Sequence, residues 1–158
     1  MVLYNPRAVF YTMPLALLAI ASALDRSEVD VVIIDGRLER DPVRAVVDAA
    51  KDAVCVGITV LTGAPIRDAL AVSRAVKAAH PRCPVVWGGW HPSLFAEQCL
   101  ADPCVDIVVK GQGEAAFAEI VGRLLGHTQV STTKRYAHLA DDPLRAATDR
   151  FGVKMAHR

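Results

Sequence analysis

The sequence predicts an α/β fold in which helices cover both faces of a parallel sheet. Short runs of β-branched and other apolar residues alternate with single segments of helical spacing, the pattern of right-handed βαβ units. The strand-like runs contain almost no polar residues, as expected for strands that are buried on both sides. We therefore expect a doubly wound, flavodoxin-like (Rossmann-like) fold with a five-stranded parallel sheet.

Composition fits one globular domain with an appendage. The chain has 158 residues, of which 53% are hydrophobic and 22% charged, enough to bury a full core. The net charge of +1 gives no bulk electrostatic attraction to nucleic acid or to an anionic membrane, so neither is an expected partner. The four cysteines form no C-x-x-C pair, which argues against a zinc ribbon and favours a reducing cytoplasm.

The expected strands end at turn residues or glycines. Asn5-Pro6 stops the first strand, Asp35-Gly36 the second and Gly88-Gly89 the fourth. Thr59 closes the third, and a glycine-containing loop from Lys110 follows the fifth. These strands are expected over residues 2–4, 29–34, 53–60, 85–87 and 105–109.

Helices are expected after each strand. Pro14 suits the first turn of the first helix, and Asp41 is a plausible N-cap with Pro42 at the first helical position of the second. The first helix is apolar enough to resemble a signal peptide, but it is shorter than the roughly 20 apolar residues that span a bilayer. The expected helices are 14–24, 42–50, 64–79, 94–100 and 114–124.

The loops at the carboxyl ends of the strands are the candidate site, because open parallel sheets bind ligands there. Glycine lets a large ligand approach the backbone, and threonine donates hydrogen bonds without charge. The dinucleotide fingerprint G-x-G-x-x-G is missing after the first strand, and no P-loop G-x-x-x-x-G-K occurs. A nicotinamide enzyme and a P-loop phosphate site are therefore disfavoured.

Several short motifs follow one another in order over residues 2–124. They are Asn5-Pro6, the helix Pro14-Leu15-Ala16-Leu17-Leu18-Ala19, Ile34-Asp35, Val56-Gly57-Ile58-Thr59, Gly88-Gly89-Trp90-His91-Pro92 and Gly111-Gln112-Gly113-Glu114. Together they resemble the cobalamin-binding domain that precedes the catalytic domain in B12-dependent radical SAM proteins. The resemblance implies cobalamin as cofactor and a separate radical SAM domain as partner.

The resemblance also implies which loops contact which part of cobalamin. The slot for the nucleotide tail of cobalamin would be formed by Thr59, Val60, Leu61, Thr62, Gly88 and Gly89. Residues near the corrin ring or the partner domain would be Asn5, Pro6, His91, Gly111, Gly113 and Glu114. Another class of cobalamin domain carries D-x-H-x-x-G, whose histidine ligates cobalt. This chain has Asp35-Gly36-Arg37-Leu38-Glu39-Arg40 instead, so we expect no such ligand.

A flavodoxin-like interaction module that has lost its ligand is the alternative interpretation. Gly88-Gly89 would then be an ordinary turn, His91 a hydrogen-bonded structural residue and Glu114 a charge at the positive end of its helix. The cysteines are expected to be small core or surface residues. The motif C-x-x-x-C-x-x-C, which would hold an iron–sulfur cluster, is absent, so we do not expect catalysis by this chain alone.

The C-terminal residues carry a different pattern. They include Leu124-Leu125-Gly126-His127-Thr128-Gln129 and Thr132-Thr133-Lys134-Arg135-Tyr136-Ala137-His138. Over about residues 121–152 this resembles the end of tyrosine recombinases (phage integrases), which implies that His127 and Tyr136 occupy the places of the assisting histidine and the nucleophile. The upstream arginines and lysine that would clamp the phosphate are absent, so we expect no strand cleavage.

We therefore expect a gene fusion, with a cobalamin-binding-like domain over residues 1–124 and a short recombinase-derived helical tail over residues 125–158. A DNA-binding remnant is a further alternative. Its basic residues would be Lys134, Arg135, Arg145 and Arg150, but Asp141, Asp142 and Asp149 offset their charge.

Overall fold

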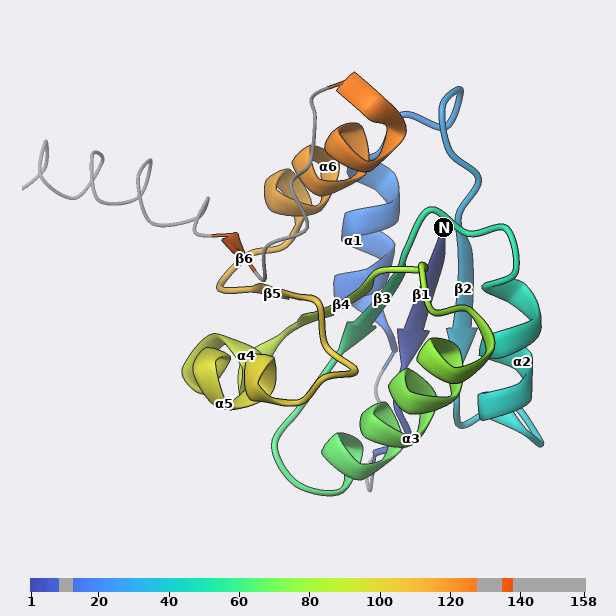
Figure 1. Cartoon of the computed structure of the whole chain (residues 1–158), viewed down its shortest axis with the longest axis vertical. Helices are drawn as coiled ribbons and strands as arrows, with labels where there is room; N and C mark the ends of the chain where they lie inside the picture. The colour runs from blue at the N-terminus through green and yellow to red at the C-terminus, as the bar shows by residue number, and fades with distance from the viewer. Residues whose placement is uncertain (9–12, 128–134, 138–158) are drawn as a thin grey trace, which may run out of the picture.

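The computed structural model describes residues 1–8, 13–127 and 135–137, and it contains a six-stranded sheet in the order β2-β1-β3-β4-β5-β6 (Figure 1). All neighbouring strands are parallel. The strands are β1 (Val2–Asn5), β2 (Val32–Asp35), β3 (Val56–Thr59), β4 (Val85–Gly88), β5 (Ile107–Val109) and β6 (Arg135–Ala137). The predicted doubly wound fold is confirmed with its five strands, and β6 adds a short sixth strand at one edge.

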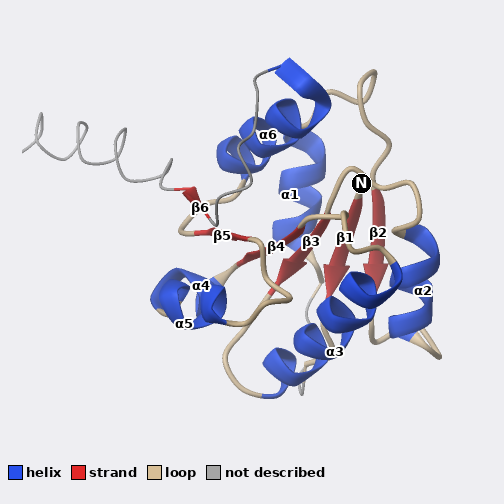
Figure 2. Ribbon diagram, viewed as in Figure 1, coloured by secondary structure: helices blue, strands red, loops and turns tan. Residues whose placement is uncertain are grey.

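Helices cover both faces of this sheet (Figure 2). They are α1 (Leu15–Ala23), α2 (Pro42–Ala49), α3 (Ala64–Ala79), α4 (Trp90–Leu94), α5 (Ala96–Ala101) and α6 (Glu114–Gly122), followed by the π-helical turn η1 (Arg123–His127). Side chains of α1 and α6 pack in one hydrophobic core, and those of α2, α3 and α5 pack in the other. None of the described helices is long and apolar enough to cross a membrane.

Each central strand contributes side chains to both hydrophobic cores. In β1, Leu3 packs with the α1 and α6 side chains, whereas its neighbour Tyr4 packs on the opposite face, and neither is exposed to solvent. Val86 and Trp87 divide in the same way in β4. Because successive strand residues point to opposite faces, a strand buried on both sides needs an unbroken apolar run, which is the pattern of the sequence.

Local signals explain most of the element boundaries, with one exception after β4. The Asp41 side chain accepts a hydrogen bond from the Arg44 backbone N–H at 3.1 Å, which confirms the predicted N-cap of α2. After β4, Gly89 has a positive φ of 95° and turns the chain directly into α4 at Trp90. The loop expected at Trp90-His91-Pro92 is thus helical, and the single helix expected over 94–100 is divided at Phe95 into α4 and α5.

The C-terminal segment contributes β6, which pairs with β5 from Ile107–Arg135 to Val109–Ala137. The edge of β5 offers backbone groups that a further strand can satisfy, and residues 135–137 of the expected helical tail take that place. Residues 128–134 and 138–158 lie outside the described residues. The helix that begins at Glu114 continues through η1 to His127, across the expected fusion point.

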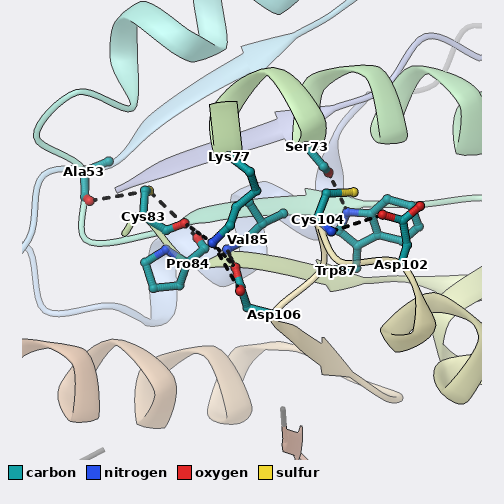
Figure 3. Close-up of polar contacts among 10 residues, drawn as sticks. All are labelled: Ala53, Ser73, Lys77, Cys83, Pro84, Val85, Trp87, Asp102, Cys104 and Asp106. Atoms are coloured by element: carbon teal, nitrogen blue, oxygen red, sulfur yellow. Dashed lines mark hydrogen bonds and ion pairs between the residues drawn. The ribbon is translucent and has the colours of Figure 1, made fainter. Parts of the chain in front are cut away.

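Polar contacts fix α3 to the sheet (Figure 3). The Lys77 Nζ lies 3.0 Å from Asp106 Oδ2, and the same carboxylate accepts the Val85 backbone N–H at 2.7 Å. The buried indole of Trp87 donates to Ser73 Oγ at 2.9 Å. These bonds position α3 against β4, from the amino end of the strand at Val85 to Trp87.

All four cysteines are buried free thiols. Burial raises the pKa of Cys55 to about 12. Burial, followed by the hydrogen bond with Asp102, raises the pKa of Cys104 to about 12 as well. Thiols with such pKa values stay protonated near neutral pH, so these residues serve as small core side chains, as predicted.

Removing the Asp106 carboxylate should destabilise the fold. In Asp106→Ala, the half-buried Lys77 loses its ion pair and the Val85 N–H its acceptor, which should lower the free energy of unfolding by about 1–3 kcal/mol in urea denaturation. Arg44→Ala removes an exposed ion pair with Asp48 and should cost less than about 1 kcal/mol. Equal effects of the two substitutions would contradict a structural role for the Asp106 contacts.

Candidate functional site

A cleft of about 250 Å³ opens at the carboxyl ends of β3, β4 and β5, where α1 and α6 approach the sheet. Its lining combines bare backbone, apolar side chains and a few polar groups. The glycines are Gly57, Gly88, Gly89, Gly111 and Gly113; the apolar residues include Leu3, Leu17, Ile20, Val109 and Phe117; the polar ones are Thr59, Gln112 and Glu114. This is the edge at which open α/β sheets bind their ligands.

The adjacent glycines of the β4–α4 turn have different roles. A Cβ on Gly88 would make only ordinary van der Waals contact with Val109, at 3.7 and 3.9 Å, so a methyl group would meet no clash there. A Cβ on Gly89 would lie 2.9 Å from Thr59 Oγ1, and this residue also has a positive φ. Gly89 is therefore required by the turn itself, whereas the absence of a side chain at Gly88 leaves room in the cleft.

Ser93 ties together the loops on either side of the cleft. Its Oγ donates to the Gly89 carbonyl at 2.7 Å and accepts the Gly111 backbone N–H at 3.0 Å. Val60 adds a second tie, since its N–H donates to the Gly88 carbonyl at 2.8 Å and its own carbonyl accepts the His91 N–H at 3.0 Å. The loops after β3, β4 and β5 are thus held as one hydrogen-bonded unit.

The structure brings half of the predicted site residues to the cleft. Those that line it are Thr59, Gly88, Gly89, Gly111, Gly113 and Glu114. Those that do not are Asn5, Pro6, Val60, Leu61, Thr62 and His91. Val60 acts through its backbone, and the side chains of Leu61 and Thr62 are exposed.

His91 belongs to a different hollow. Its Nδ1 lies 3.4 Å from Thr62 Oγ1, and its ring centroid is 5.1 Å from that of Phe95. It lines a cavity of about 140 Å³ together with residues of α3 and α5, among them Leu70 and Cys99. The imidazole therefore stabilises the surroundings of α4 and lies outside the cleft.

The loops after β1 and β2 are joined at the same edge of the sheet. The Asn5 carbonyl accepts the Gly36 N–H at 2.9 Å, and Arg7 Nε donates to the Gly36 carbonyl at 2.7 Å. Asp68 of α3 accepts hydrogen bonds from the Tyr4 hydroxyl at 2.6 Å and from the Arg7 N–H at 2.8 Å. Burial, reinforced by Asp68, raises the pKa of Tyr4, so its hydroxyl stays a donor.

An ion pair lies beside Asn5 where β2 ends. Arg37 Nη2 is 2.5 Å from Asp35 Oδ2, and the hydrogen bonds from Arg37 are the main cause that lowers the pKa of Asp35. The carboxylate is therefore occupied by a cation from its own loop. Among the described residues, no group of three or more His, Cys, Asp or Glu side chains could hold a metal ion.

Sequence reasoning missed the side chains that form the walls. Leu17 and Ile20 come from α1 and Phe117 from α6, and each belongs to an apolar helical stripe that predicts core packing alone. Ser93 directly follows the Gly88-Gly89-Trp90-His91-Pro92 motif, but only the three-dimensional turn shows that its hydroxyl reaches Gly111. A hydroxyl residue in the first turn of a helix was the available signal.

The doubly wound sheet with a glycine-lined cleft at its carboxyl edge defines a ligand-binding α/β domain. Residues 3–121 match the family model described as the B12 binding domain. The chain belongs to this B12-binding family.

A much longer protein is similar to this chain. An uncharacterized methyltransferase from Pyrococcus horikoshii is 38% identical over 124 residues, which cover 75% of this chain and 26% of the relative. The chain thus spans about a quarter of the length of that protein.

Ser93→Ala should weaken ligand binding at the cleft while leaving the core intact. The substitution removes both the bond to the Gly89 carbonyl and the bond from the Gly111 N–H, so the two loops lose their shared anchor. We expect cobalamin affinity to fall on the order of tenfold, as two lost hydrogen bonds imply, in a spectroscopic titration. Ser93→Thr retains the hydroxyl and should recover most of the affinity; equal losses in both variants would contradict the anchor.

Proposed function

We propose that the cleft between the sheet and the helices α1 and α6 holds the nucleotide tail of cobalamin. The loops after β1 and β5 would lie near the corrin ring. The observation that carries this proposal is Gly88, whose missing side chain leaves its backbone bare to a cleft in a chain of the B12-binding family. A bulky nucleotide tail requires such a close approach to the backbone.

The chemistry of the lining suits the ribose and base of the tail rather than a free anion. Thr59 offers a hydroxyl, the glycine loops offer backbone groups, and the remaining walls are largely apolar. The described lining residues include no lysine or arginine that would pair with a free phosphate or carboxylate. Such a surface favours an uncharged aromatic and sugar moiety.

When bound, cobalamin supplies a cobalt centre that can carry an alkyl group. We expect no histidine of this chain to ligate it in the D-x-H-x-x-G manner, because none of the five histidines has an aspartate two positions before it. His91 lies in the hollow beside α3 and α5 instead of the cleft. The role of the chain is then to bind and orient the cofactor.

A separate catalytic domain completes the proposal. The relative is nearly four times as long as the matched segment, and its name describes a methyltransferase. Exposed apolar side chains on α1 and α4, near the ends of the strands, could meet such a domain; they include Leu15, Leu18, Trp90 and Leu94. The motifs of the chain resemble those of B12-dependent radical SAM proteins, so we infer a radical SAM partner that acts in group transfer.

The alternative is an interaction module without a ligand, favoured by the same exposed apolar residues. For the C-terminal part, the recombinase-like motifs support a fusion with a tail over residues 125–158. This assignment rests on the sequence, because most of these residues lie outside the described ones.

Purified protein should retain hydroxocobalamin through gel filtration and show a corrin spectrum. Gly88→Val should lower the affinity by at least about tenfold, since a β-branched side chain would fill ligand space in the cleft. Ala115→Val adds similar volume at an exposed position of α6 that does not line the cleft, and it should bind like the parent chain. A parent protein that stays colourless in excess cobalamin would favour the interaction module.

Truncation after Leu125 should leave cobalamin uptake unchanged, because the cleft lining ends at Phe117.

With the full chain, Tyr136 should form no covalent adduct with a suicide DNA substrate, since the arginines that stabilise a pentavalent phosphate are absent. Gel electrophoresis of the labelled DNA would measure this, with Tyr136→Phe as control. A Tyr136-dependent adduct, or loss of cobalamin uptake on truncation, would show that the two-part division is wrong.

A further inference from the structure

We propose that Phe117, seated on Gly57, closes the inner end of the cleft and makes it selective for cobamides whose tail ends in an apolar aromatic base. Cobamides that end in a polar purine would bind more weakly. This inference rests on the proposed function, because it concerns which base the tail carries.

The strand register shows that Gly57 and Phe117 lie deeper in the cleft than the glycine loops. Thr59 pairs with Gly88 at the carboxyl edge, whereas Gly57 lies two residues earlier in β3 and pairs with Leu3 of β1. Leu3, Gly57 and Phe117 all line the cleft. They therefore form its inner end, one pleat below the rim.

The missing side chain of Gly57 sets the position of the Phe117 ring. A Cβ on Gly57 would lie 2.8 Å from Leu3 Cδ2 and closer still to Phe117 Cζ. The ring, only 3% exposed, thus rests directly on the backbone of β3. Because an extra methyl group cannot fit beneath the ring, the pair Gly57–Phe117 determines how far the cleft extends.

Polarity also changes along the cleft. Thr59 lies at the rim, and Gln112 and Glu114 belong to the loop that follows β5. The α1 side of the cleft is apolar, with Leu17 and with Ile20, whose Cδ1 would lie 3.0 Å from a Cβ on Gly113. An apolar aromatic base would lose no hydrogen bonds on entering this part, whereas a purine would bury ring nitrogens and an amino group next to hydrocarbon.

Leaving a buried polar group without a partner weakens binding by roughly tenfold or more per group. The cleft should therefore distinguish cobalamin, which carries dimethylbenzimidazole, from adeninylcobamide, which carries adenine. Cobinamide, which lacks the base altogether, reports on the corrin contacts alone. These three compounds separate the contribution of the base from that of the ring.

The test is a titration of the full chain with the hydroxo form of each compound, followed by corrin absorbance. We expect cobalamin to bind at least about tenfold more tightly than adeninylcobamide and than cobinamide. Ile20→Thr places a hydroxyl in the wall and should reduce the preference for cobalamin over adeninylcobamide severalfold. Leu18→Thr, on the exposed side of the same helix, should leave that preference unchanged.

A second pair of variants tests the inner end. Gly57→Ala should push the Phe117 ring into the cleft and lower the affinity for cobalamin but not for cobinamide. Adding Phe117→Leu removes the two ring atoms that the new methyl group meets, leaves only the flexible end of Leu3 to adjust, and should restore cobalamin binding. Circular dichroism establishes that each variant is folded; if Gly57→Ala is not, the comparison of Ile20→Thr with Leu18→Thr decides.

The outcomes distinguish this inference from the proposed function. Equal affinities for cobalamin and adeninylcobamide would overturn the selectivity and leave cobalamin binding in place. Equal affinities for cobalamin and cobinamide would show that the base does not enter the cleft and would also overturn it. Failure of all three compounds to bind would overturn the proposed function itself.

Discussion

The site depends on one constraint: at the carboxyl edge of the sheet, glycines must leave the backbone uncovered by side chains. Gly57 and Gly88 lie in adjacent central strands; the missing side chain of Gly88 leaves room in the cleft, whereas that of Gly57 makes room for the Phe117 ring. A larger residue at Gly88 would take up cleft volume, and one at Gly57 would displace the Phe117 ring. The helices α1 and α6, which pack on the same face of the sheet, can then form walls of the cleft.

This bare edge would be of little use if its loops moved independently. Ser93 and Val60 link the three loops that follow β3, β4 and β5. Arg7, which also bonds to Asp68, links the loops that follow β1 and β2 at the same edge of the sheet. The ties use mainly backbone groups, which the strands already place in register. Positioning therefore costs little additional ordering, since most of the groups are fixed by the sheet.

The sequence was sufficient to predict the fold and the edge that carries the site, because apolar runs and terminal glycines are local signals. It was insufficient wherever the outcome depended on a turn in three dimensions. Gly89 at positive φ makes Trp90-His91-Pro92 helical and directs His91 to the hollow beside α5, which no spacing rule indicates. Phe117 was part of an ordinary core stripe, and its position above Gly57 depends on a contact between β3 and α6 that is distant in sequence.

The order of the strands separates the cleft from whatever follows it. The last residue that lines the cleft is Phe117 in α6. The chain then continues through η1 and adds β6 beside β5. An edge strand of this kind satisfies backbone groups and makes few demands on sequence. Among the described residues, β6 contributes none to the lining of the cleft, so the pairing at this edge leaves the site unaltered, whatever the origin of the C-terminal segment.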